Sequence, residues 1–92
     1  MSRRNSGRAA AAFRNHYKTA SRLGDWVLCK QIAEQMRGLD DSAETQYALG
    51  YALEHLGDLD EARKVYQAVL IIDSRHERAR TRLRSLAIGS SR

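Results

Sequence analysis

The most constraining feature of this sequence is residues 43–76, where apolar residues follow a helical period on both sides of one glycine. Before that glycine, Leu49, Leu53 and Leu56 lie three or four residues apart and so fall on one stripe of a helix. Gly57 follows, and a glycine just past the last apolar residue can adopt the left-handed conformation that ends a helix. After it comes a second apolar stripe, formed by Leu59, Ala62, Val65, Tyr66, Val69 and Ile72. Since proline interrupts neither half, the segment predicts two helices folded into a hairpin.

Small and large residues alternate across this predicted hairpin. Gly50 and Ala62 would let the two backbones approach closely, while Leu53, Tyr66 and Val69 would fill the space around them. We therefore expect Gly50 to lie where two helices touch, so that a larger residue there would overpack the contact.

The same segment resembles a tetratricopeptide repeat, a helical hairpin of 34 residues with a fixed order of small and large positions. The residues that carry the resemblance are Leu49-Gly50, Leu53, Gly57-Asp58, Ala62, Tyr66 and Asp73. Gln46 and Ser74 depart from the pattern, because the family has tryptophan and proline at these places. The resemblance implies an all-α, right-handed stack of helical hairpins, with helices expected near residues 9–22, 26–37, 43–56, 59–72 and 76–88.

The rest of the chain can be divided by comparison with this repeat. Residues 10–42 form a degenerate first copy, because Leu23-Gly24-Asp25 and Leu39-Asp40 match Leu56-Gly57-Asp58 and Ile72-Asp73 at an offset of 33 residues. Residues 76–88 predict a capping helix, and residues 8–88 together are expected to form one domain. Residues 1–7 are rich in serine, arginine, asparagine and glycine and are predicted to be a disordered tail, and residues 89–92 a second tail.

Three residues of the first copy can be interpreted through this offset. Cys29 matches Ala62 and is expected to be a small packing residue. Tyr17 matches Gly50, which predicts a looser first hairpin or a shifted register. Trp26 is expected to anchor the start of the second helix.

The sequence also bears on where the protein works. Its single cysteine cannot form an internal disulfide, so the reducing cytoplasm is the expected location. No apolar run approaches the roughly 20 residues that span a membrane. The arginine-rich, acid-free N-terminus also resembles an organellar transit peptide, but Phe13, Tyr17, Ala20 and Leu23 continue it as a helix that the fold needs.

Charge is distributed very unevenly along the chain. Residues 1–22 hold six bases and no acid, residues 23–74 hold four bases and ten acids, and residues 75–92 hold six arginines and one glutamate. This order suggests contacts between copies of the chain or binding of an acidic partner. A homo-oligomer is expected, because solenoids usually need about three repeats to bury a continuous core.

No catalytic, cofactor or metal site is expected. His16, His55 and His76 lie far apart in sequence and are interpreted as surface or partly packed residues. The chain has neither a Cys-x-x-Cys pair nor a glycine-rich phosphate loop. The sequence therefore predicts a protein that is not an enzyme.

A binding surface remains, and the resemblance implies its place. In tetratricopeptide proteins the first helix of each hairpin lines a concave groove that receives a peptide. Carried onto this sequence, the groove would be lined by Arg14, Lys18, Arg22, Tyr47, Tyr51, Arg78 and Arg82. Tyrosines supply amphipathic contact area and cations favour acidic groups.

Two functions of different class fit these observations. The first is a protein-binding adaptor or small chaperone that holds a peptide or helix of a partner with acidic groups. The alternative is a nucleic-acid or other polyanion binder that uses the arginine-rich terminal helices. The acidic middle and the scarcity of lysine favour the first.

Overall fold

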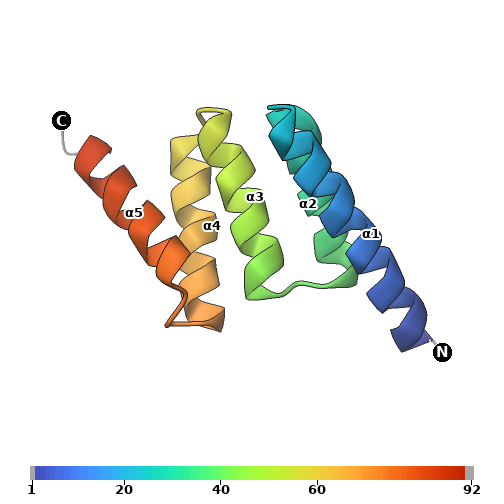
Figure 1. Cartoon of the computed structure of the whole chain (residues 1–92). Helices are drawn as coiled ribbons and strands as arrows, with labels where there is room; N and C mark the ends of the chain where they lie inside the picture. The colour runs from blue at the N-terminus through green and yellow to red at the C-terminus, as the bar shows by residue number, and fades with distance from the viewer. Residues whose placement is uncertain (1, 91–92) are drawn as a thin grey trace.

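The computed structural model describes residues 2–90, and the side chains of residues 8, 9 and 11–87 among them. It contains five helices: α1 (Ser2–Arg22), α2 (Trp26–Leu39), α3 (Ala43–His55), α4 (Leu59–Ile72) and α5 (Glu77–Ser90). Figure 1 shows the helices side by side in chain order, with successive helices running in opposite directions and the two termini at opposite ends. The stack is elongated, about 50 × 29 × 17 Å. The prediction of an all-α stack of helical hairpins is confirmed, and the described residues include no strand.

The predicted helix ends agree with the observed ones to within two residues, except at the start of α1. This helix begins at Ser2 rather than near residue 9, so it includes residues 2–7 of the predicted disordered tail, and residue 1 lies outside the described residues. Residues 2–8 contain no proline to block a helix, and the alanines of positions 9–12 have the highest helix propensity. At the other end α5 continues to Ser90, and residues 91 and 92 of the predicted tail lie outside the described residues.

The first helix of each hairpin ends at a glycine with a left-handed backbone. Gly24 and Gly57 have φ angles of 74° and 88°. After α3, the amide of Gly57 donates to the carbonyl of Glu54 at 3.1 Å, and the amide of Asp58 donates to that of Leu53 at 3.0 Å. The turn at Gly24 repeats both hydrogen bonds. This cap satisfies carbonyl groups that the helix end leaves open, so the sequence offset between the two copies is reproduced in the backbone.

The second hairpin packs around Tyr66 of α4. Ala62, Tyr66 and Val69 are fully buried, and the Tyr66 ring lies against Gly50 of α3. A Cβ atom added at Gly50 would lie only 2.8 Å from Cε1 of that ring. The prediction that Gly50 lies at a helix contact is confirmed.

The first hairpin accommodates Tyr17 by directing its ring towards the next hairpin. The Tyr17 hydroxyl donates to the carbonyl of Ala48 in α3 at 2.6 Å. Cys29 is fully buried, with its thiol 3.9 Å from the Tyr17 carbonyl oxygen, which confirms its packing role. Burial, and to a smaller extent the Asp25 carboxylate, raise the pKa of this thiol and so lower its reactivity. The bulky residue at position 17 thus ties the two hairpins together.

Candidate functional site

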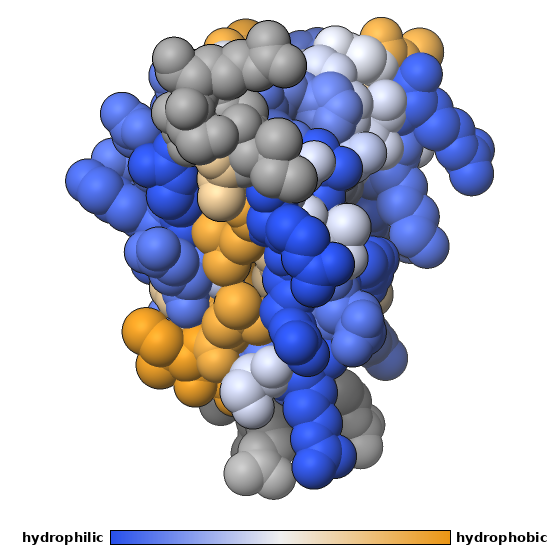
Figure 2. Space-filling view, turned by 90° about the vertical axis from the view of Figure 1, so that its left-hand side faces the viewer, coloured by the Kyte–Doolittle hydropathy of each residue, from blue (hydrophilic) through white to orange (hydrophobic). Residues whose placement is uncertain are grey.

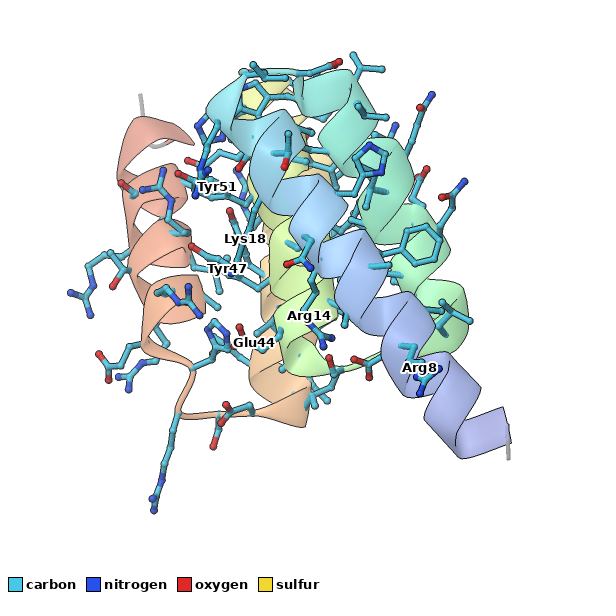
Figure 3. All side chains as sticks on the ribbon, turned by 45° about the vertical axis from the view of Figure 1, so that its right-hand side comes forward. Arg8, Arg14, Lys18, Glu44, Tyr47 and Tyr51 are labelled. Carbon is cyan, nitrogen blue, oxygen red and sulfur yellow. The ribbon has the colours of Figure 1, made fainter. Side chains whose placement is uncertain are left out.

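A groove of about 480 Å³ opens on the face of the stack where the first helices of the hairpins lie. Residues of α1, α3 and α5 form most of its lining. Figure 3 shows Arg14 and Lys18 of α1 beside Tyr47 and Tyr51 of α3, in the space between α1 and α5. The remaining lining residues are Tyr17, Met36, Asp40, Glu44, Thr45, Ala48 and Arg78.

Five of the seven residues predicted for a groove line this one, namely Arg14, Lys18, Tyr47, Tyr51 and Arg78. Arg22 does not, because it lies one helical turn beyond Lys18, at the very end of α1. Arg82 is also outside the lining, because Glu54 of α3 holds its guanidinium. Whether a partner binds in the groove stays a prediction.

A row of aromatic rings runs along α3 from the groove to the start of α2. Tyr47, Tyr51 and His55 are four residues apart, with ring centroids 5.9 Å apart for the two tyrosines and 4.5 Å for Tyr51 and His55. Trp26 stacks on His55 at 3.8 Å, so it anchors the start of α2 as predicted. The part played by His55 was missed, although its four-residue spacing from Tyr51 could have indicated it.

Glu44 and His76 form a polar cluster at the α5 side of the groove. Oε1 of Glu44 lies 2.9 Å from Nε2 of His76, and its Oε2 accepts from Arg78 at 3.0 Å. The amide of Ala79 donates to Nδ1 of His76 at 3.1 Å. A backbone N–H group can only donate, so Nδ1 of His76 must be the acceptor. The ring proton is therefore on Nε2, which donates to Glu44. Arg78 also lies over the Tyr47 ring, 5.0 Å from its centroid.

This cluster holds the beginning of α5 against α3. His76 directly precedes α5, and its Nδ1 satisfies one of the amides that the first turn of a helix leaves open. His76 was expected to be a surface or partly packed residue, but it is buried. A histidine at the first position of the helix predicted for residues 76–88 was the available signal. Its partner Glu44 is 32 residues away, and no sequence pattern connects the two.

A second polar cluster joins α3, α4 and α5 at Glu54. Arg82 donates from Nε to Oε1 of Glu54 at 3.0 Å and from Nη2 to Oε2, and the Tyr66 hydroxyl donates to Oε1 at 2.9 Å. Burial pushes the pKa of Glu54 up, but the hydrogen bonds from Arg82 and Tyr66, together with nearby positive charge, chiefly that of Arg82, hold this pKa below its usual range. The bond to Glu54 likewise raises the pKa of Arg82, so the cluster contains a stable ion pair.

The groove presents unpaired positive charge on its α1 wall. Arg14 and Lys18 are exposed, and no acidic side chain of the described residues forms an ion pair with either. The acidic lining is partly neutralised, because Glu44 forms an ion pair with Arg78. An anionic group entering the groove would therefore meet two available cations beside two tyrosine rings.

Neither a metal site nor a membrane span was found in the part of the chain that the structure describes. No three or more histidine, cysteine, aspartate or glutamate side chains within it are grouped to hold a metal ion. None of its helices is both long and apolar enough to cross a lipid bilayer.

Helical hairpins stacked in chain order beside one groove define a protein of the α-helical repeat class. Residues 43–76 match the tetratricopeptide repeat family, so this segment of the chain is similar to one such repeat. Such repeats are a non-enzymatic module that generally mediates interactions between proteins. No curated protein matches the chain.

Proposed function

We propose that this chain is a non-enzymatic adaptor or small chaperone that binds an acidic segment of a partner protein in the groove between α1 and α5. The observation that carries the proposal is the convergence of Tyr47 and Tyr51 with Arg14 and Lys18 around one cavity of about 480 Å³. We place the protein in the cytoplasm, since its single cysteine serves packing and not a disulfide.

The chemistry of the groove suits an extended or helical peptide. The rings of Tyr47 and Tyr51 offer rigid amphipathic area at low entropic cost, on which an apolar side chain can rest. Carboxylates of the same peptide can then pair with Arg14 and Lys18. A groove that combines the two selects acidic segments with an apolar residue over purely charged ones.

The alternative, binding of nucleic acid through the arginine-rich helices, is less well supported. Two arginines of α5, Arg78 and Arg82, are already paired with Glu44 and Glu54, which lowers the positive charge left for phosphates. A titration with single-stranded nucleic acid at two salt concentrations separates the proposals. Tight binding that weakens steeply with salt would favour the nucleic-acid function.

Truncating Tyr51 should weaken peptide binding without unfolding the protein. We expect Tyr51→Ala to lower affinity for acidic peptides by at least about fivefold, or roughly 1 kcal/mol, because it removes one of the two tyrosine rings, Tyr47 and Tyr51, on which the peptide would rest. Lys18→Gln should also weaken binding, whereas Lys64→Gln on α4, outside the groove lining, should not.

Fluorescence anisotropy with short acidic peptides and their lysine-substituted counterparts would measure these differences. Tyr51→Phe is the matched control, because it keeps the ring and removes only the hydroxyl. Equal affinity of wild type and Tyr51→Ala would move the binding site out of this groove.

Self-association is a separate proposal that follows from the exposed ends of the stack. At the first end, Tyr17 and Trp26 pack within the protein, but Leu23 and Val27 are 78% and 57% exposed. We expect light scattering to give a mass above that of the monomer at high concentration in low salt. Leu23→Ser with Val27→Ser should reduce this mass, and a monomer under all conditions would contradict the proposal.

A further inference from the structure

The C-terminal end of the stack carries an exposed apolar strip. Figure 2 looks at this end and shows a band of hydrophobic atoms with hydrophilic atoms on both sides. On α4, the spacing of Val65, Ala68 and Ile72 puts them on one line of the helix. The first two are half-buried and Ile72 is 52% exposed. Leu83 of α5 is also half-buried, and it packs, like Val65, against the hydrophobic core around Tyr66.

The order of the helices explains why this strip is open. Counted along the stack, α5 takes the place of the first helix of a third hairpin, as α3 is the first helix of the second. Leu83 matches Leu49 of α3 at an offset of 34 residues, and Leu49 is only 4% exposed because α4 packs over that region. Within the described residues no helix covers α5 in the same way. The strip therefore lies where a further helix would pack on α5 in the way that α4 packs on α3.

Positive charge borders the strip on its α5 side. Helical geometry places Arg80 and Arg84 next to Leu83, on the side of α5 that faces away from the groove. Both are exposed. Arg80 lies 3.9 Å from Glu77 in an exposed pair, which screens it weakly, and Arg84 forms no ion pair with the described residues. The arginines on the opposite side of α5, by contrast, are held by acids of α3.

We propose that Val65, Ala68, Ile72 and Leu83 form a docking site for an amphipathic helix of a partner protein, one whose apolar stripe is flanked by aspartate or glutamate. A helix fits because the line from Val65 to Ile72 covers about two turns, the length over which a helix presents apolar residues at three- and four-residue spacing. Acidic flanks fit because they would meet Arg80 and Arg84.

Arg84 also shapes how such a helix would sit. It occupies the place that Gly50 has in the second hairpin, so a helix cannot approach α5 as closely as α4 approaches α3. A carboxylate of the partner helix opposite Arg84 would form an ion pair with its guanidinium. A partner with a neutral or basic residue there would leave the guanidinium crowded and unpaired.

A second copy of this chain is a poorer occupant for this site. The segments at its two ends, residues 1–22 and 75–92, are both strongly basic. Either end would bring like charges together on docking here. The acids on the exposed side of α4, Asp60 and Glu61, are already next to Arg63 and Lys64.

The test uses two synthetic helical peptides with the same leucine stripe, one flanked by glutamates and the other by lysines. We expect the glutamate peptide to bind the full chain and to shift the amide resonances of residues 65–72 and 83–84 in an NMR titration. Arg84→Glu should weaken its binding by about tenfold or more, and Ile72→Ser should weaken it as well. Arg8→Glu, the same charge change on α1 at the far end of the stack, should leave binding within about twofold, and circular dichroism checks that each variant keeps its helices.

Several results would overturn this docking site. These are equal binding of the lysine peptide, unchanged affinity in Arg84→Glu, or the absence of shifts at residues 65–72 and 83–84. A wild-type dimer that Ile72→Ser dissociates would assign the strip to a second copy instead. Because the groove is also proposed to bind acidic peptides, the titration is repeated with Tyr51→Ala. Binding in the groove should weaken in this variant, whereas the shifts of residues 65–72 and 83–84 should remain.

Discussion

Replacing Gly50 with leucine should lower the free energy of unfolding by about 3 kcal/mol, the upper end of the usual cost of overpacking a core. The first added carbon would already lie 2.8 Å from Cε1 and 3.0 Å from Cδ1 of Tyr66. Tyr66 cannot simply swing away, because its ring is fully buried and its hydroxyl donates to Glu54. The leucine side chain therefore has to push α3 and α4 apart.

A smaller change at the same place gives the sharper comparison. Glycine to alanine inside an exposed helix normally stabilises by about 0.5–1 kcal/mol. Gly38 in α2 has nothing within 4 Å of an added Cβ, so Gly38→Ala should show this gain. Gly50→Ala should instead destabilise by about 1 kcal/mol or more, because its Cβ meets the Tyr66 ring.

Urea unfolding followed by circular dichroism measures both alanine variants and Gly50→Leu under the same conditions. We expect the change in unfolding free energy to have opposite signs in Gly38→Ala and Gly50→Ala. A gain of stability in Gly50→Ala equal to that in Gly38→Ala would show that α3 and α4 are not in close contact at Gly50.

The helices could be predicted from the sequence because their determinants are local. Apolar residues at three- and four-residue spacing fix which face of a helix is buried, and Gly24 and Gly57 fix where two of the helices end. Most of the residues that line the groove could be predicted from the same periodicity, since Tyr47 and Tyr51 lie one turn apart on α3. Once the helices stack in order, residues of α1, α3 and α5 must share one face.

The polar clusters could not be predicted, because they depend on side chains that meet across long sequence separations. His76 reaches Glu44 over 32 residues, and Arg82 reaches Glu54 over 28. A sequence places Arg82 on the groove side of α5 but cannot show that Glu54 turns its guanidinium away from the groove. For the same reason the sequence could not show that the Tyr17 hydroxyl reaches Ala48 of the next hairpin.

Removing the Glu54 carboxylate should be the second most damaging change. Glu54→Ala would leave the Tyr66 hydroxyl and the Arg82 guanidinium without their partner in a region where the Glu54 side chain is only 13% exposed. We expect a loss of about 2–3 kcal/mol, less than for a fully buried pair because the Arg82 side chain is 34% exposed. Glu61→Ala is the control, since its pair with Lys64 is exposed and should contribute about 0.5 kcal/mol or less.

The pH dependence of stability provides an independent test of the same cluster. The pKa of Glu54 is lower in the folded protein than its ordinary value, so the folded state favours the carboxylate. Its contribution is therefore complete above the pKa of an unfolded glutamate, about 4.3, and is lost as pH falls through the lower folded pKa. The gap in unfolding free energy between wild type and Glu54→Gln should be widest near neutral pH and should shrink towards pH values of about 3. A gap that stays constant from neutral to acid pH would mean that packing around position 54, and not the charged pair with Arg82, stabilises the junction of α3, α4 and α5.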